Sequence, residues 1–249
     1  LASAAEGIDR DAVSVGRDAL DVNGRTEQFD ALSPSALEAA RLWQSALRAT
    51  LASEDEREIY SPAPAQGTAR LRRAIAHHLR GTRGMNVDPN NIVIGAGAQL
   101  LDTMLVQLLG ADKVYAVEDP GYLRLTRIYQ AMGCKVRHIP LDDAGVDVSI
   151  LQKSGTDVLH LMPSHQYPTG LVTSIARRYA LLSWAAERPG RYLIEDDFDC
   201  EFRLAGKPIP ALASIDAAQS VIYTNTFSKS LSSALRLAYM VLPDELMER

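Results

Sequence analysis

The sequence predicts an α/β fold with a largely parallel sheet. From residue 91 onward, short apolar runs of strand length alternate with apolar or amphipathic stretches of helix length. This alternation is typical of strand–helix–strand units joined by right-handed crossovers. The chain has 249 residues, of which 47% are apolar, and this is enough to bury a sizeable core. In such sheets ligands bind beyond the carboxyl ends of the strands, so we look for function in the loops that follow the strands.

The first 57 residues are predicted to form a linker or N-terminal arm with one helix, and residues 58–249 to form the main domain. Residues 1–30 are polar, acidic and aperiodic, as expected of a linker. Ser33 and Pro34 then provide a helix start. Apolar side chains at helical spacing follow this start, namely Leu42, Trp43, Ala46, Leu47 and Leu51.

The remaining elements follow from periodicity and from breaker residues. A loop rich in proline and glycine is expected over residues 54–67, and a helix over about 68–81. Further helices are expected over residues 98–109, 121–132 and 173–187. The expected strands are residues 92–94, 114–117, 135–139, 158–161, 192–194, 221–223 and 237–241.

The composition gives no support to several classes of function. The net charge of −5 gives no reason to expect this piece to bind nucleic acid or a membrane surface. No run of eighteen apolar residues and no signal-peptide pattern occurs, so a cytoplasmic location is expected. The two cysteines are expected to be reduced, and nothing near them has metal-ligand spacing. Because the chain starts at Leu1 and stops at Arg249 as a new helix begins, we expect a fragment cut at both ends.

One lysine stands out at the end of a predicted strand. Residues 221–223 lead into a run of small hydroxyl residues around Lys229, and Arg236 follows seven residues later. The chain has only five lysines against twenty-one arginines, and among the five only Lys229 lies among side chains suited to phosphate. Such a lysine could form a Schiff base with a phosphate-bearing aldehyde cofactor. From this segment alone, an ordinary exposed loop lysine is the alternative.

Two other loops add possible ligand-binding features. Residues 95–99 form a glycine-rich turn at a helix start, where backbone N–H groups and the helix dipole favour a phosphate. Plain packing would also explain these glycines. After the strand at 114–117, Tyr122 could stack on a flat heterocycle, and Arg124 could pair with a carboxylate. A turn tyrosine and a solvated arginine are the alternatives.

The last two loops carry polar clusters. Residues 162–170 place hydrogen-bonding side chains between two prolines, which indicates an ordered loop. Residues 195–201 hold five carboxylates in seven positions. These could form a Mg²⁺ site or a solvated acidic loop. They could also include one buried aspartate that keeps a pyridine nitrogen protonated, so that the ring draws electrons.

Together these residues resemble fold type I pyridoxal-phosphate proteins of the class I/II aminotransferase group. Within that group the chain is most similar to the aminotransferase-like domain of MocR-type regulators of the GntR family. The resemblance covers about residues 58–245, and its most specific parts are residues 163–170, 194–202 and 226–237. It implies a three-layer α/β/α large domain. It also implies that an N-terminal winged helix-turn-helix domain and a small C-terminal domain accompany this domain, although neither is present in these residues.

The resemblance implies a role for each candidate residue. Lys229 would form the Schiff base with pyridoxal 5′-phosphate, Asp196 would pair with the pyridine nitrogen, and Tyr122 would stack on the ring. Arg124 is the candidate for an amino-acid carboxylate, and Tyr60 would reach the phosphate of a partner subunit in a homodimer. The residues implied to hold the phosphate are Ala98, Gln99, Thr226, Ser228 and Arg236.

Three departures from the family pattern bear on these roles. Phe198 stands where the regulators commonly have tyrosine, and phenylalanine cannot donate a hydrogen bond to the ring hydroxyl of the cofactor. Ser233 and Ala238 replace a common proline and glycine, which are milder changes. Before residue 58 the match is poor, because the usual Phe-Pro before the tryptophan is missing.

Two functions are consistent with these residues. The first is a cofactor-binding effector and dimerisation domain of a transcriptional regulator, in which an amino acid or amine shifts a two-state arrangement read by an attached DNA-binding domain. The second is a free-standing aminotransferase that moves an amino group between an amino acid and a 2-oxo acid. The third alternative is an α/β domain that binds no cofactor. Fold alone cannot separate the first two functions.

Overall fold

The domain is built on one mixed eight-stranded sheet. A computed structural model describes residues 34–53, 61–202 and 209–248, and all structural statements below concern these residues. The strand order is β1-β8-β7-β6-β5-β2-β3-β4. The strands are β1 (Ile92–Gly95), β2 (Val114–Asp119), β3 (Lys135–Asp142), β4 (Gly145–Val146), β5 (Val158–Leu161), β6 (Tyr192–Asp196), β7 (Val221–Thr226) and β8 (Ala238–Val241).

The centre of the sheet is parallel. Strands β3, β2, β5, β6 and β7 run in one direction, whereas β8 is antiparallel to both of its neighbours, β7 and β1. Strand β1 therefore points the same way as the central strands. The carboxyl ends of β1, β2, β5, β6 and β7 consequently meet at one edge of the sheet.

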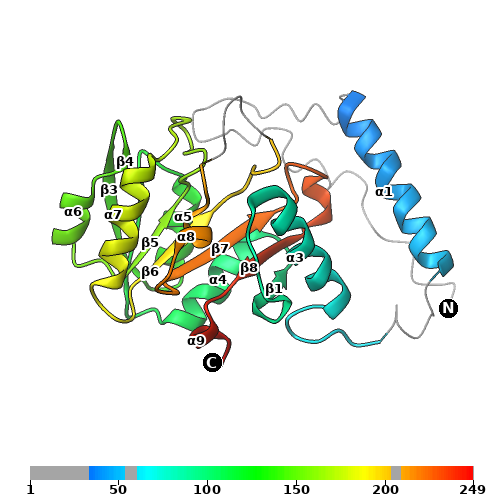
Figure 1. The fold of residues 1–249 in the computed structure, drawn as a ribbon, viewed down its shortest axis with the longest axis horizontal. Coiled ribbons are helices and arrows are strands. Elements are labelled where there is room, and N and C mark those ends of the chain that lie inside the picture. Colours follow the sequence, from blue (N-terminus) through cyan, green and yellow to red (C-terminus); the bar gives the residue numbers. More distant parts are fainter. Residues whose placement is uncertain (1–33, 54–60, 203–208, 249) are drawn as a thin grey trace, which may run out of the picture.

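Helices cover both faces of the sheet, which gives three layers (Figure 1). One face packs against α4 (Ala98–Leu109) and α5 (Leu123–Ala131), and the other packs against α7 (Ile175–Ala186) and α3 (Ala69–Arg83). The shorter helices are α6 (Val148–Lys153), α8 (Leu212–Ile215) and α9 (Asp244–Met247), with 3₁₀ turns η2 (Pro89–Asn91) and η3 (Ser233–Leu235). No described helix is long and apolar enough to cross a membrane.

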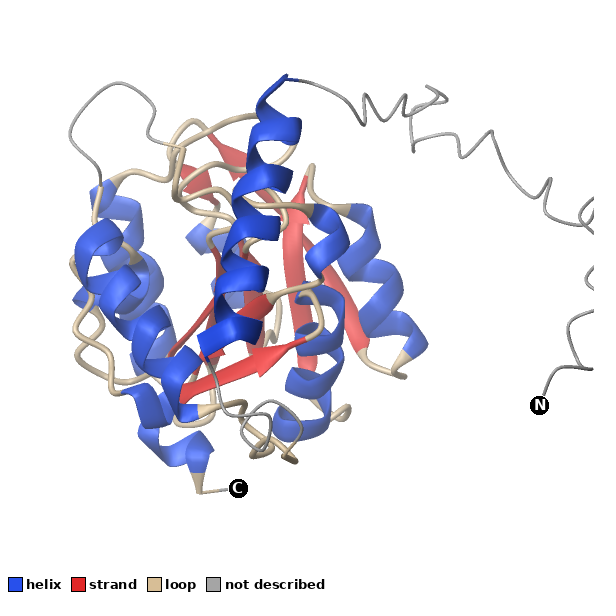
Figure 2. Cartoon of the chain, turned by 90° about the vertical axis from the view of Figure 1, so that its right-hand side faces the viewer, coloured by secondary structure: helices blue, strands red, loops and turns tan. Residues whose placement is uncertain are grey.

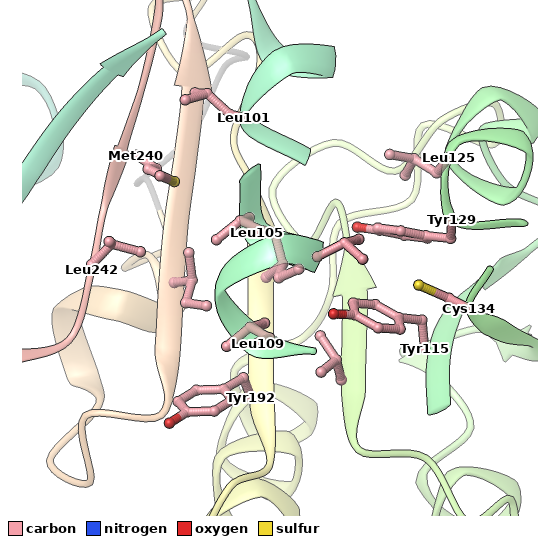
Figure 3. Packing of buried hydrophobic residues seen from close by; sticks show 14 of the residues in the cluster. Leu101, Leu105, Leu109, Tyr115, Leu125, Tyr129, Cys134, Tyr192, Met240 and Leu242 are labelled. Atoms are coloured by element: carbon pink, nitrogen blue, oxygen red, sulfur yellow. The ribbon is translucent and has the colours of Figure 1, made fainter. Parts of the chain in front are cut away.

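Helix α4 shows why these residues fold as they do. Leu101, Leu105 and Leu109 recur every fourth residue, so they lie on one face of the helix and pack onto the sheet (Figure 3). Tyr115 of β2 and Tyr129 of α5 stack beside them with ring centroids 4.8 Å apart. Both tyrosine rings are fully buried. This cluster fixes α4, and with it the turn at the start of α4, against the sheet.

Helix α1 (Pro34–Ser53) lies at one side of the domain, apart from the sheet layers (Figure 1), and Figure 2 views the domain from that side. It contains the apolar stripe that the sequence indicates for a helix in this region. Its large apolar side chains Leu42, Trp43, Leu47 and Leu51 are exposed. The boundary expected between an arm and a main domain at residues 57 and 58 falls outside the described residues.

The expected α/β fold with a mostly parallel sheet is confirmed. The helix expected over residues 98–109 has those bounds, and the others agree to within about two residues. Strand β3 runs three residues further than the expected 135–139, and strand β4 and helices α6 and α8 were not expected. A two-residue strand and helices of six and four residues are too short to show a period in the sequence.

Candidate functional site

The turn between β1 and α4 can bind an anion together with an arginine from the other end of the chain. Gly97 is the N-cap of α4, so no side chain caps the first N–H groups of the helix, at Ala98 and Gln99. A Cβ built on Gly97 would overlap Nη2 of Arg236. The guanidinium therefore lies directly against this helix start. Free N–H groups, the helix dipole and a fixed cation together suit a phosphate.

The segment after β7 adds hydroxyl groups on the same edge of the sheet. Every residue of β7 is buried, and Thr226 is the last of them. Its Oγ1 accepts a hydrogen bond from the backbone N–H of Ser228 at 3.2 Å and donates to Ser228 Oγ at 3.0 Å. This local pattern holds the turn that presents Lys229, whose side chain is exposed. The lysine is free to face a ligand at the edge of the sheet.

Asp196 ends β6, and its surroundings favour the uncharged acid. Burial raises the pKa of Asp196 to about 7, and the charges of Asp197 and Asp199 add to this rise. His160 of β5 points at it, with Nε2 lying 3.9 Å from Asp196 Oδ2. A cation that binds against Asp196 would reverse this preference, because an opposite charge favours the carboxylate.

Sequence reasoning missed two side chains that lie near Asp196. His160 is buried, and its burial lowers its pKa to about 3, so the imidazole is neutral. The hydroxyl of Tyr129 lies 2.6 Å from His160 Nδ1. Because a neutral imidazole has one acceptor nitrogen, we assign the hydroxyl as donor to Nδ1, which leaves Nε2–H directed at Asp196. The only sequence signal was a histidine inside the apolar strand β5.

Tyr122 and Arg124 lie together at the start of α5, as their spacing implies. Tyr122 is 36% exposed, and the Arg124 guanidinium lies 5.8 Å from the centroid of its ring. The ring of Tyr167 meets Tyr122 edge to face at 5.8 Å. Gln166 ties the two loops together, because its Nε2 donates to the carbonyl of Pro120 at 2.8 Å. The exposed ring of Tyr122 and the guanidinium of Arg124 thus both lie at the edge of the sheet where the parallel strands end.

Each carboxylate of the acidic segment 195–201 has its own basic partner. Apart from Asp196, whose neighbour is His160, each carboxylate lies within 4 Å of a basic side chain from another element. These pairs are Glu195 with Arg178 at 3.6 Å, Asp197 with Arg83 at 2.8 Å, Asp199 with His165, and Glu201 with His78 at 3.3 Å. Within the described part of the chain, no group of three or more potential ligands could hold a metal ion. The segment is thus a set of individually paired carboxylates.

Phe198 lies in the middle of this segment. Its ring stacks on that of His165, with centroids 6.1 Å apart and an angle of 19°, and it packs against the apolar cluster under α4. It offers no hydroxyl to a ligand. Tyr60, the residue implied to reach a partner subunit, lies outside the described residues.

Comparison with known proteins places this geometry in context. Residues 25–249 match the family described as aminotransferase class I and II. The HTH-type transcriptional regulator YdeL of Bacillus subtilis (strain 168) is 39% identical over 77% of this chain and 41% of its own length. The HTH-type pyridoxine biosynthesis transcriptional regulator PdxR of Corynebacterium glutamicum is 38% identical over 85% of this chain and 46% of its own length.

Among solved structures, the α-aminoadipate aminotransferase LysN of Thermus thermophilus, complexed with N-(5′-phosphopyridoxyl)-L-leucine, is 29% identical. It superimposes with a TM-score of 0.67 over 86% of this chain and 54% of its own. The chain spans less than half the length of the two regulators and about half of this enzyme.

Proposed function

Because the chain belongs to the aminotransferase class I and II family, we propose that it is the effector and dimerisation domain of a GntR/MocR-type transcriptional regulator, with pyridoxal 5′-phosphate held on Lys229. The observation that carries the regulator assignment is the similarity to HTH-type regulators over three quarters or more of the chain. In the whole protein, a winged-helix domain on the N-terminal side would bind DNA.

The donor set at the sheet edge fits this cofactor. Backbone N–H groups of Ala98 and Gln99 and the guanidinium of Arg236 would bind the phosphate, and Thr226 and Ser228 would add hydroxyl groups. Gly97 is required because a Cβ there would displace Arg236. When bound, the cofactor supplies an aldehyde that forms a Schiff base with an amine, and a pyridine ring that draws electrons.

The remaining residues bind and orient the ring. Lys229 would be the amine that holds the aldehyde. Asp196 would accept a hydrogen bond from the protonated pyridine nitrogen, and His160 Nε2 lies 3.9 Å from the Asp196 carboxyl group. Tyr122 would stack on the ring, and Arg124, whose guanidinium lies 5.8 Å from the Tyr122 ring, would pair with the carboxylate of an incoming amino acid.

An amino acid or amine that exchanges onto the cofactor would change the contacts at Lys229 and Arg124. A homodimer with two states of different affinity for that compound would then shift its population. An attached DNA-binding domain would report the shift, which makes the amino compound an effector. The cation at Arg124 favours an effector that carries a carboxylate.

A catalytic aminotransferase is the second candidate, and the likeness to LysN favours it. In that case Lys229 would also move a proton at the substrate carbon as general acid and base. Rapid conversion of an amino acid to its keto acid by the full-length protein would support this candidate and argue against a purely regulatory domain.

The test of cofactor attachment uses the full-length protein and its absorbance. The wild-type protein should show the visible band of a Schiff base, and Lys229→Ala should lose it. Lys153→Ala is the matched control, since Lys153 is an exposed lysine at the end of α6. An unchanged band in Lys229→Ala would remove the basis for the assignment. The reading frame upstream of Leu1 tests the regulator: it should encode a winged helix.

A further inference from the structure

Arg83 connects helix α3 to two loops of the candidate site. It is the last residue of α3, and its Nε lies 2.8 Å from Asp197 Oδ2. Its Nη2 donates to Ser164 Oγ at 3.0 Å in the loop after β5. Helix α3 is itself anchored by buried Ile75 and Leu79 in the cluster under β1, β7 and β8. The guanidinium is therefore a fixed cation behind the sheet edge.

Asp197 depends on this cation for charge compensation. Its side chain has no exposed surface, and that of Arg83 is 8% exposed. The hydroxyl of Tyr223 donates to Asp197 Oδ2 at 2.7 Å, but Oδ1 has no hydrogen-bond partner among the described residues. A buried carboxylate that loses its cation retains an uncompensated charge in a medium of low polarity.

Asp197 directly follows the residue assigned to the pyridine nitrogen. Consecutive side chains at the end of a strand point to opposite faces of the sheet. Asp196 accordingly meets His160 on one side, and Asp197 meets Arg83 on the other. After burial, the charge of Asp197 is the largest cause of the raised pKa of Asp196. The two carboxyl groups are thus electrostatically linked.

We propose that Arg83 is a positioning residue whose charge compensates Asp197 and thereby keeps Asp196 available as a carboxylate for the cofactor ring. That a cofactor ring binds at Asp196 rests on the proposed function, whereas the electrostatic link between Arg83 and Asp196 does not. Arg83 acts through Asp197 and does not touch the cofactor.

Among the other described groups near these two carboxyls, Arg178 is a buried cation that interacts with Asp197, but it already pairs with Glu195 at 3.6 Å. His160 on β5 is neutral, because burial lowers its pKa to about 3. Burial raises the pKa of Asp102 on α4 well above its usual range and that of Glu118 on β2 to about 8, and neither carboxyl group can supply a positive charge. The remaining groups nearby are Tyr129, Glu195 with its partner Arg178, Asp199, Cys200 and Tyr223.

The primary experiment measures the titration of Asp196 in the full-length protein without cofactor. Carboxyl ¹³C NMR follows the aspartates, and the Asp196→Asn variant assigns the resonance. In Arg83→Met the midpoint of Asp196 should rise by about one pH unit, a tenfold change in proton affinity, because an uncompensated like charge favours the protonated acid. The double variant with Asp197→Asn should return close to wild type, since it removes both charges.

Three further variants separate charge from packing. Arg83→Lys keeps the charge and should titrate like wild type. Ser164→Ala removes the hydrogen bond at 3.0 Å without changing any charge, and it should leave the midpoint unchanged. Asp197→Asn alone should lower the midpoint. This last variant tests the link even if Arg83→Met does not fold.

The outcomes decide the proposal in either direction. If Arg83→Met and its double variant titrate at the same midpoint, Arg83 acts by packing alone and the proposal is wrong. An unshifted midpoint in Asp197→Asn overturns it as well. In protein that binds pyridoxal 5′-phosphate, Arg83→Met should weaken binding at pH 7 several-fold and the double variant should restore it. Wild-type protein without affinity for the cofactor would refute the proposed function, while the titration would still decide the role of Arg83.

Discussion

Replacing Gly97 by alanine should weaken binding of pyridoxal 5′-phosphate while the domain stays folded. Gly97 has φ 98° and ψ 157°, a backbone conformation open to glycine and few other residues. The added methyl group would also occupy the position of Arg236 Nη2. The substitution therefore strains the start of α4 and displaces the guanidinium from the phosphate site.

The two effects differ in what they change. Backbone strain of this type costs on the order of 1–3 kcal/mol of folding free energy. Displacing Arg236 removes a hydrogen bond to a charged group, which contributes roughly 1.5–3 kcal/mol. The second effect acts on binding and corresponds to an increase of about 10- to 150-fold in Kd for the cofactor.

The assay is a binding titration of the full-length protein with pyridoxal 5′-phosphate, with thermal unfolding measured in parallel. Gly81→Ala is the matched control, because Gly81 lies inside α3 and a Cβ there would meet no atom within 4 Å. It should leave Kd unchanged and stabilise the helix by roughly 0.5–1 kcal/mol. Arg236→Met should reproduce the loss of binding. If folded Gly97→Ala binds the cofactor as tightly as wild type, the phosphate does not lie between α4 and Arg236.

Three other predictions concern the fold and its ionisation. Because the pKa of Asp196 is about 7 when folded and about 3.9 when unfolded, the folded state holds the extra proton and stability falls as pH rises from 4 to 7. Without cofactor, Asp196→Asn should therefore have a higher free energy of unfolding than wild type at pH 8, by on the order of 4 kcal/mol at most. Denaturant titrations should show this difference vanishing towards pH 4. Arg178→Met should cost about 3–5 kcal/mol, because it leaves Glu195 buried and unpaired, whereas Arg188→Met at an exposed pair should cost at most about 1 kcal/mol. Equal losses in urea melts would contradict this contrast. Leu105→Ala should lower the free energy of unfolding by about 2–5 kcal/mol through the cavity under α4, and a loss below about 1 kcal/mol would show that this core is not close-packed.

The sequence was most informative where the relevant signal is local. Strand and helix periods depend on neighbouring residues, so the alternation from β1 to β7 and the apolar face of α4 could be predicted. The polar residues at the strand ends followed from the same pattern, since parallel strands bring their carboxyl ends to one edge. The direction of β8 could not be predicted in this way. A four-residue apolar run has the same pattern in parallel and antiparallel pairing.

The acidic segment 195–201 shows the limit of sequence reasoning. Its composition allowed a cation site, a solvated loop or one buried carboxylate. The structure pairs its carboxylates with bases from α3, β5, α7 and the loop after β5, which lie up to 123 residues away in the chain. Only packing determines which of these distant residues meet.

The sequence alone therefore determined the α/β class, which depends on the local period of short segments. It also predicted the cofactor residues, with Lys229 chosen among five lysines from its neighbours and the other roles taken from the family resemblance. The tertiary structure decided that Arg236 lies against Gly97, that His160 and Tyr129 lie near Asp196, and that Arg83 lies behind it. Those contacts join residues distant in the chain, and they exist because burial of the sheet faces fixes where each strand ends.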